Sequence, residues 1–287
     1  MVHGRQTGAR SWEGTSRVSW RLGVLKRRVR AYVRGVDERP PADPTNTQFL
    51  LHLSGYRWVA ETFGPLRARR VLDVASGEGY GSGTLAAGGA TVVGIDLDAV
   101  VVRRARGAYP GARFLRMDAT RLAFRAESFD LAISQDTLEH IADDAGFVAE
   151  VERVLTRDGV LVLFTPHALV HTRAPANPYH VREYSPESLR ALLCVQFGSV
   201  RLFGRRPAAR MSCAEAGLND VRRWDPLGLR RFIVPPGVRH RLGSWILRCR
   251  GRAGLEMLSA ADVEYLEGVQ DSGTLIAVCH KRVGPAG

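Results

Sequence analysis

The sequence has few cysteines, and those that occur are far apart. Cys194, Cys213, Cys249 and Cys279 form no Cys-x-x-Cys pair and show no Cys/His spacing of a zinc site. Neither a disulfide framework nor a structural zinc site is therefore indicated. We expect these thiols to be buried among apolar side chains.

Long apolar runs are also missing. No stretch reaches the roughly 18 apolar residues of a membrane-spanning helix. The first 20 residues are basic and lack the apolar centre of a signal peptide. These absences predict a soluble, cytoplasmic protein.

Lysine is almost absent, although the formal net charge is +12. Nearly all of the positive charge comes from arginine, which attracts nucleic acid and anionic membranes but also accumulates through compositional bias. Residues 1–44 are rich in arginine and end in a proline-rich stretch. We interpret 1–44 as a basic, mobile arm.

Apolar strand-like segments alternate with helix-like ones, which predicts an α/β fold with a doubly wound, mostly parallel, seven-stranded sheet. The expected strands are 70–75, 91–96, 113–118, 130–135, 159–165, 199–204 and 273–280. The expected helices are 45–63, one from about 81, one after Asp98, 143–155 and 186–193. Residues 45–204 would form the core, 205–272 an inserted cap, and 273–287 the final strand and tail.

A glycine cluster directly follows the first expected strand, in VLDVASGEGYGSG at 71–83. Glycines allow close backbone approach to a ligand, and the start of the following helix favours negative charge. A dinucleotide fingerprint would need a third glycine where Ser82 stands. The Asp73 carboxylate would repel a pyrophosphate but can pair with an ammonium group. S-adenosylmethionine carries such an amine beside a carboxylate, so it fits this loop better.

These motifs resemble those of the class I S-adenosylmethionine-dependent methyltransferases. The resemblance covers 50 to about 204 and rests on VLDVASGEGYG, GIDLD, MDATRLAF, FDLAISQDTLEHI and LTRDGVLVLFTPH, in that order. It implies a Rossmann-like fold with S-adenosylmethionine as cofactor. The implied cofactor-binding residues are Asp73, Ala75, Gly77, Gly79, Asp96, Leu97, Asp118, Ala119 and Gln135.

The resemblance also implies a role for each acid. Asp73 would lie near the methionine amine, and Asp96 would accept hydrogen bonds from both ribose hydroxyls. Leu97 would pack on the adenine ring. Asp118 would meet the adenine amino group, with the Ala119 backbone beside the ring.

The segment after the fourth expected strand bears on the methyl acceptor. Adenine-N6 methyltransferases of this class carry an Asn/Asp-Pro-Pro-aromatic motif there, whereas 134–137 is SQDT. The similar NPYH at 177–180 follows the fifth strand and is misplaced. Base methylation by that mechanism is disfavoured, and we expect nucleic acid not to be the acceptor.

Asp136, Glu139 and His140 follow that strand. The stretch resembles ubiquinone-biosynthesis-type O-methyltransferases, which have Glu in place of Asp136 and in which these residues are associated with a divalent metal. Two other readings remain open: Glu139-His140 fixes the loop, or His140 is a general base. We predict His140 and His180 as catalytic residues and no metal ligand.

Residues 177–193 resemble a segment of bacterial methyltransferases encoded with glycan and natural-product pathways. They would place His180, Arg182 and Tyr184 over the carboxyl edge of the sheet, or serve only as a connector that braces the cap. The basic stretch 230–252 of the cap could contact a membrane surface, touch a nucleotide sugar or cover the pocket.

Together these features predict O-methylation of a small molecule, a sugar or a lipid-linked glycan. The alternatives are an RNA or protein methyltransferase docked by the basic arm, a non-catalytic S-adenosylmethionine-binding module, and a dehydrogenase. Intact Asp73, Asp96 and Asp118 argue against lost cofactor binding, and Ser82 argues against the dehydrogenase.

Overall fold

The computed structural model describes residues 42, 46–169, 172, 177–213 and 258–282. Apart from the short segment Asn177–Tyr179, these residues belong to one compact unit. The basic arm 1–44 lies outside the described residues except for Ala42, and so does the basic stretch 230–252. Among the helices described, none combines the length and apolar character needed to cross a membrane.

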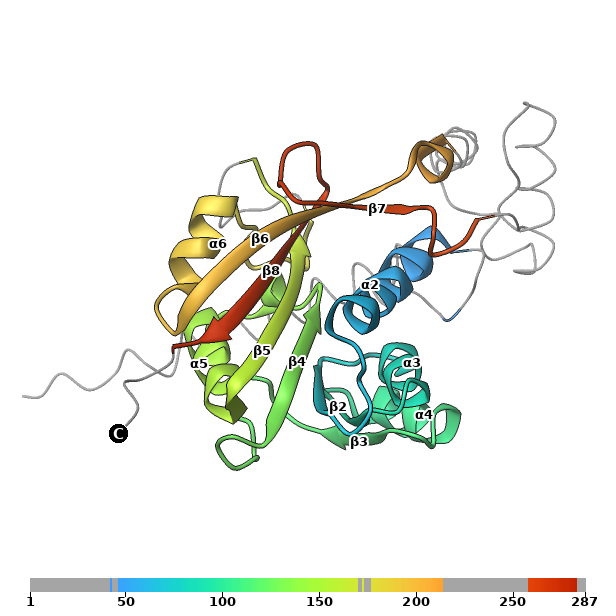
Figure 1. The fold of residues 1–287 in the computed structure, drawn as a ribbon, viewed down its shortest axis with the longest axis vertical. Helices are drawn as coiled ribbons and strands as arrows, with labels where there is room; N and C mark the ends of the chain where they lie inside the picture. The colour runs from blue at the N-terminus through green and yellow to red at the C-terminus, as the bar shows by residue number, and fades with distance from the viewer. Residues whose placement is uncertain (1–41, 43–45, 170–171, 173–176, 214–257, 283–287) are drawn as a thin grey trace, which may run out of the picture. The chain divides into compact units, whose positions relative to one another are not determined.

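The unit is built on one twisted sheet of strand order β3-β2-β1-β4-β5-β8-β6-β7 (Figure 1). The first five strands in this order are mutually parallel, whereas β8 runs antiparallel to both of its neighbours and β7 runs antiparallel to β6. The strands are β1 (Arg70–Val74), β2 (Thr91–Asp96), β3 (Arg113–Arg116), β4 (Phe129–Gln135), β5 (Leu155–Pro166), β6 (Phe197–Pro207), β7 (Val263–Leu266) and β8 (Thr274–Lys281).

Helices cover both faces of the sheet, which confirms the predicted doubly wound α/β fold. The helices are α2 (Thr47–Phe63), α3 (Tyr80–Ala87), α4 (Ala99–Ala108), α5 (Asp144–Val154) and α6 (Pro186–Leu193), with a 3-10 turn η1 (Leu138–His140). Buried side chains of α5 and α6 pack on one face, and those of α2, α3 and α4 pack on the other.

Side-chain caps fix where several helices begin. Asn46 accepts hydrogen bonds from the first backbone N–H groups of α2, and Asp98 and Asp143 do the same for α4 and α5. Ser185 caps α6 in a reciprocal capping box, with Pro186 at the first helical position. These caps therefore fix where α2, α4, α5 and α6 begin.

In the described residues the sheet has eight strands, so the predicted count of seven was wrong. The additional strand β7 lies inside 205–272 and pairs with Gly204–Pro207 at the end of β6. The predicted cap therefore begins within β6 and contains β7 near its end. In a strand of four residues, the alternation of apolar and polar side chains is too short to be recognised from the sequence. The strand that β7 pairs with also lies far away in the sequence.

The expectation of buried thiols was wrong for two of the three described cysteines. Cys194 and Cys213 are exposed, and Cys279 is buried. Cys279 lies in β8 between two other strands, whereas Cys194 follows α6 at the surface. Burial raises the pKa of the Cys279 thiol well above its ordinary value.

Candidate functional site

The backbone of the glycine loop takes up left-handed conformations at alternate residues. The φ angles of Ala75, Gly77 and Gly79 are 60°, 54° and 85°. A Cβ at Gly79 would lie 2.8 Å from Ala105 and Phe114, so this glycine lets α3 begin close against its neighbours. A Cβ at Gly77 would meet nothing within 4 Å. The backbone at Gly77 is therefore bare and faces open space, as a ligand approaching the loop requires.

Asp96 ties this loop to the end of β2. Its two carboxylate oxygens accept hydrogen bonds from the backbone N–H of Gly77 at 3.1 Å and of Asp98 at 2.9 Å. The Ser76 N–H also donates to the Ile95 carbonyl at 2.8 Å. Asp96 is 5% exposed. Its carboxylate thus orients the glycine loop and stands at the carboxyl edge beside it.

The remaining residues implied for the adenine side follow β2 and β3 at the same edge. Leu97 is 59% exposed, which leaves its surface available to a planar ligand. Asp118 is exposed and accepts hydrogen bonds from the Thr120 N–H and hydroxyl at 2.9 and 2.8 Å. Ala119 is half-buried. The parallel register Asp96↔Arg116 brings these strand ends together.

Asp73 is fully buried beneath the loop. It accepts hydrogen bonds from the Tyr56 hydroxyl at 3.0 Å and from the Ser82 hydroxyl at 2.6 Å. Burial raises the pKa of the Asp73 carboxyl from 3.8 to about 6, although both hydroxyls oppose the shift. The structure therefore gives Asp73 a role in holding α2 and α3 against β1, and its contact with a methionine amine stays a prediction.

A second polar network, which the sequence analysis missed, lies at the end of β4. The His52 imidazole of α2 contacts the Tyr80 hydroxyl through Nδ1 at 3.1 Å and the Asp136 carboxylate through Nε2 at 3.0 Å. The Arg205 guanidinium approaches the same Asp136 oxygen at 3.7 Å. Burial alone would raise the pKa of Asp136, but His52, Arg205 and His140 outweigh it and hold the pKa below its ordinary range.

Gln135 belongs to this network. Its side-chain amide donates to the His52 carbonyl at 3.1 Å, and its oxygen accepts from Arg205 at 3.3 Å. It is 7% exposed. The structure therefore assigns Gln135 to cross-linking α2, β4 and β6, and its predicted cofactor contact stays a prediction.

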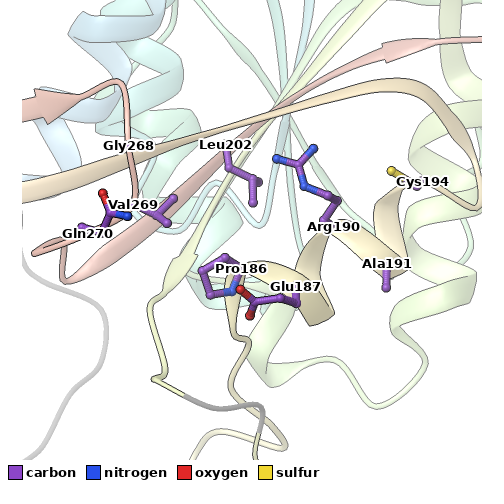
Figure 2. A pocket seen from close by; sticks show the side chains of 9 residues that line it. All are labelled: Pro186, Glu187, Arg190, Ala191, Cys194, Leu202, Gly268, Val269 and Gln270. Carbon is purple, nitrogen blue, oxygen red and sulfur yellow. The ribbon is translucent and has the colours of Figure 1, made fainter.

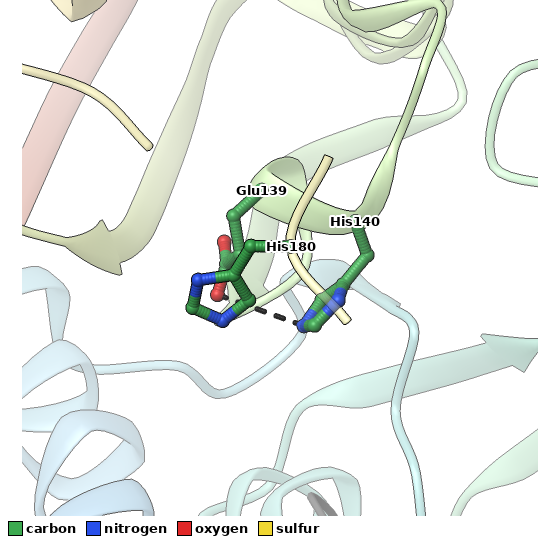
Figure 3. Close-up of side chains that lie close together, drawn as sticks. All are labelled: Glu139, His140 and His180. Carbon is green, nitrogen blue, oxygen red and sulfur yellow. Dashed lines mark ion pairs between the residues drawn. The ribbon is translucent and has the colours of Figure 1, made fainter. Parts of the chain in front are cut away.

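The two predicted catalytic histidines lie against each other. The rings of His140 and His180 meet edge to face, with centroids 5.0 Å apart, and Glu139 lies beside them (Figure 3). His140 Nε2 is 3.8 Å from a Glu139 oxygen, and His180 Nδ1 is 2.7 Å from Glu183 Oε1. The side chains of His140 and His180 are 30% and 10% exposed, respectively. Sequence reasoning proposed both histidines but could not show that they meet.

Arg182 and Tyr184 attach the segment that carries His180 to the start of α5. Both side chains bond the Asp144 carboxylate at the start of α5, and Arg182 also donates to the Ala142 carbonyl at 2.8 Å. Tyr184 is 1% exposed. These two residues therefore attach the segment to α5, and bracing of the cap stays a prediction. His180 is the member of the segment that reaches the cluster with Glu139 and His140.

A pocket of about 550 Å³ lies elsewhere in the fold, between α6, β6 and the β7–β8 turn (Figure 2). None of the predicted site residues lines it. It is lined by Pro186, Glu187, Arg190, Ala191, Cys194, Leu202, Gly268, Val269 and Gln270. We therefore place the candidate site on the residues at the carboxyl edge of β1 to β4 and not in this pocket.

Comparison with known proteins finds relatives of the part of the chain that carries most of these residues. A family model described as a methyltransferase domain matches residues 72–163, which run from β1 to β5. A "Probable S-adenosylmethionine-dependent methyltransferase" of Mycobacterium tuberculosis (strain H37Rv) is 32% identical over 157 residues, which cover 54% of this chain and 56% of that protein. The match thus spans about half the length of this curated relative.

Two further relatives cover more of their own length. A demethylmenaquinone methyltransferase of Renibacterium salmoninarum is 30% identical over 177 residues, covering 54% of this chain and 74% of that protein. The crystal structure of an S-adenosylmethionine-dependent methyltransferase from Thermotoga maritima matches 82% of this chain and 92% of that one, with a TM-score of 0.53 and 15% identity. At that identity the second match bears on the fold alone. The sequence matches, together with the glycine loop and Asp96, show that the chain belongs to the S-adenosylmethionine-dependent methyltransferase family.

Proposed function

We propose that this chain transfers the methyl group of S-adenosylmethionine to a hydroxyl of a small molecule, a sugar or a lipid-linked glycan. The observation that carries the proposal is the bare, left-handed backbone at Gly77 at the carboxyl edge that also carries the His140–His180 pair. β1 and β4 are parallel neighbours, so their carboxyl ends share one edge at the point where the strand order reverses. Cofactor and acceptor can meet there.

On the cofactor side, the loop Ala75–Gly79 would receive the methionine part of S-adenosylmethionine. Asp96 already orients the loop through Gly77, and a carboxylate has capacity for further hydrogen bonds, which the ribose hydroxyls would use. The exposed Leu97 would cover one face of the adenine, with Asp118 and Ala119 at its rim.

On the acceptor side, methyl transfer from a sulfonium is a displacement along one line, so the protein mainly aligns the two reactants. A hydroxyl acceptor must also lose a proton, and a neutral imidazole can take it. An ionised Glu183 only accepts hydrogen bonds, so His180 Nδ1 is its donor, which sets Nε2 as the nitrogen of neutral His180 that can accept a proton. His140 and His180 are the proposed catalytic residues.

The choice of a small-molecule acceptor over nucleic acid is supported by one relative and by one motif. The Renibacterium salmoninarum protein is named for demethylmenaquinone, a small-molecule acceptor. SQDT at 134–137 departs from the Asn/Asp-Pro-Pro-aromatic pattern of adenine methylation, and Gln135 of this stretch is engaged inside the fold. RNA docking by 1–44 and membrane contact by 230–252 concern residues outside the described ones and gain no support from the structure.

Asp96→Ala tests the cofactor side. We expect S-adenosylmethionine affinity to fall by about 2 to 3 kcal/mol, because the ribose loses a charged acceptor and Gly77 loses its anchor. Calorimetry on the full chain measures the change, with Asp98→Asn as a control that keeps a capping side chain at the start of α4. Unchanged affinity in a folded Asp96 variant would contradict the assignment.

His140→Ala and His180→Ala test the acceptor side. We expect loss of the base to slow single-turnover methyl transfer by roughly 10²- to 10⁴-fold without changing cofactor affinity. Mass spectrometry of candidate acceptors reports the gain of one methyl group. His280→Ala is the matched control, because His280 is exposed and pairs with Val160 near the opposite edge of the sheet. Full transfer in both test variants would rule out histidine base catalysis.

A further inference from the structure

Glu139, His140 and His180 form a cluster whose side chains converge (Figure 3). One carboxylate oxygen and one nitrogen from each imidazole all lie within 4.8 Å of one another. Glu139 and His140 belong to η1 at the end of β4, and His180 comes from the segment after β5. Glu139 is buried and the histidines are half-buried. Because bonds from these atoms to Zn²⁺ are about 2.0 to 2.2 Å long, small side-chain adjustments would bring all three to one cation.

Outer partners orient two of these side chains. The Thr165 hydroxyl of β5 donates to Glu139 Oε2 at 2.9 Å, which aims the other carboxylate oxygen toward the histidines. Glu183 holds His180 through Nδ1 at 2.7 Å. Histidines that bind metals through one nitrogen are commonly held in this way through the other. The cluster therefore has the supporting contacts of a metal site.

The backbone also fixes the cluster. The Glu139 carbonyl accepts hydrogen bonds from the N–H groups of Val181 and Arg182 at 2.7 and 3.4 Å. These bonds attach the segment that follows His180 to η1. Main-chain hydrogen bonds, in addition to the contacts of the His180 ring, thus fix the position of His180 relative to Glu139.

Asp136 is not part of this cluster. Its carboxylate lies 3.0 Å from the His52 imidazole and 3.7 Å from the Arg205 guanidinium. The Asp136 carboxylate therefore already has partners of its own. The set that the ubiquinone-type resemblance implies, Asp136 with Glu139 and His140, is therefore not the set that the structure brings together. His180 is the third member of the cluster in place of Asp136. It lies 40 residues after His140 in the sequence, so no local spacing pattern could predict that the two meet.

We propose that Glu139, His140 and His180 bind a divalent transition-metal cation, with Zn²⁺ as the representative. Two imidazoles and one carboxylate suit this class of cation better than Mg²⁺ or Ca²⁺, which prefer oxygen ligands. Three protein ligands leave at least one coordination position for water or an acceptor oxygen. A cation bound there would supply Lewis-acid polarisation of an oxygen ligand. It would occupy one nitrogen of His140 and one of His180, so in the metal-bound chain these histidines would be ligands and not the proton acceptors of the proposed function. Metal binding rests on the cluster alone, and only its use in catalysis rests on the proposed methyl transfer.

The test is calorimetric titration of the full, chelator-treated chain with Zn²⁺ and separately with Mg²⁺, without S-adenosylmethionine or acceptor. We expect one equivalent of Zn²⁺ to bind and Mg²⁺ to bind far more weakly. Glu183→Gln, which alters only an outer partner, should weaken Zn²⁺ binding by about 10- to 100-fold. His140→Ala and His180→Ala, which remove ligands, should weaken it by more than that. His280→Ala should leave it unchanged.

Several results would overturn the proposal: no Zn²⁺ binding by the unmodified chain, full affinity in both histidine variants, or an equal loss in His280→Ala. Melting temperature and S-adenosylmethionine affinity are measured on every variant to establish folding. Glu139 is buried and accepts a hydrogen bond from Thr165, so Glu139→Gln could fail to fold, and the variants of the two half-buried histidines then decide. Zn²⁺ binding without any methyl transfer would count against the proposed function and leave the metal site standing.

Discussion

Asp73 has an environment unlike that of an ordinary carboxyl group. It lies beneath the glycine loop with no exposed surface, and its hydrogen-bond donors are the neutral hydroxyls of Tyr56 and Ser82. Because the pKa of Asp73 is about 6, the group is mainly ionised at neutral pH despite its burial. A buried charge of this kind lowers stability unless a cation approaches it.

This environment predicts a pH-dependent stability. The folded pKa is raised from 3.8 to about 6, so the folded state binds the proton more tightly than the unfolded state. The resulting stabilisation is complete below about pH 4 and is lost as the pH rises to about 6. Relative to Asp73→Asn, we expect the free energy of unfolding of the unmodified chain to fall by about 3 kcal/mol across this window. Denaturant titrations at several pH values measure it.

Adding S-adenosylmethionine turns the same measurement into a test of the predicted amine contact. An ammonium group near Asp73 favours the ionised carboxyl and lowers its pKa. With saturating cofactor, the fall in stability should therefore move to lower pH and become smaller. A fall of unchanged size and position would show that the amine is held elsewhere.

At this scale the sequence was informative for residues that follow a strand directly. Asp96 ends β2 as predicted and Leu97 follows it directly, whereas Asp118 lies two residues beyond β3, which is shorter than predicted. The cofactor contacts of all three stay predictions. His52 and Arg205 were missed. Their roles depend on which elements pack against β4, and no local pattern encodes that contact.

Among the elements, the turn from β1 into α3 and helix α4 contain two different kinds of glycine. Gly77 needs its left-handed backbone and faces open space, whereas Gly107 in α4 has no neighbour within 4 Å and no positive φ. The two positions differ in backbone conformation and in their place relative to the candidate site. They therefore form a matched pair for substitution.

We expect Gly77→Ala to cost about 1 kcal/mol of stability, because an L-residue is strained in that conformation. Its methyl group would also enter the proposed cofactor space, so S-adenosylmethionine affinity should fall at least tenfold. Gly107→Ala should instead stabilise the chain by about 0.5 kcal/mol and leave affinity unchanged. Denaturant unfolding and calorimetry give both quantities. Equal cofactor affinity in the two variants would argue against a cofactor at Gly77.

Helix α2 shows why whole elements were predicted better than their contacts. The apolar spacing of residues 45–63 predicted a helix, and the structure has one at Thr47–Phe63. The same helix supplies Tyr56 to Asp73 and His52 to Asp136, and its Gly55 faces Gln135 so closely that a Cβ would lie 2.3 Å from the amide. Periodicity identifies a buried face, but it does not identify the strand that the face meets.

For the molecule as a whole, Cys279 offers a probe of global opening. It is buried in β8, which is bonded on both sides, so a reagent should reach it only when the sheet opens. We expect Cys194 and Cys213 to react quickly in the native protein and Cys279 to react only at the rate of unfolding. In a Cys194→Ser, Cys213→Ser, Cys249→Ser background, the labelling rate should rise with denaturant. Fast labelling without denaturant would show that β8 opens locally.

The place of β8 in the sheet has a consequence for how the chain can be made. β6 and β7 join the parallel strands only through β8, although β8 follows both of them in the sequence. While the chain is being synthesised, β1 to β5 can already pair, but β6 and β7 have no strand to connect them to that sheet. Its open edge at β5 stays unpaired until residues up to Lys281 have left the ribosome. Protection of that edge during synthesis is therefore a requirement set by the strand order.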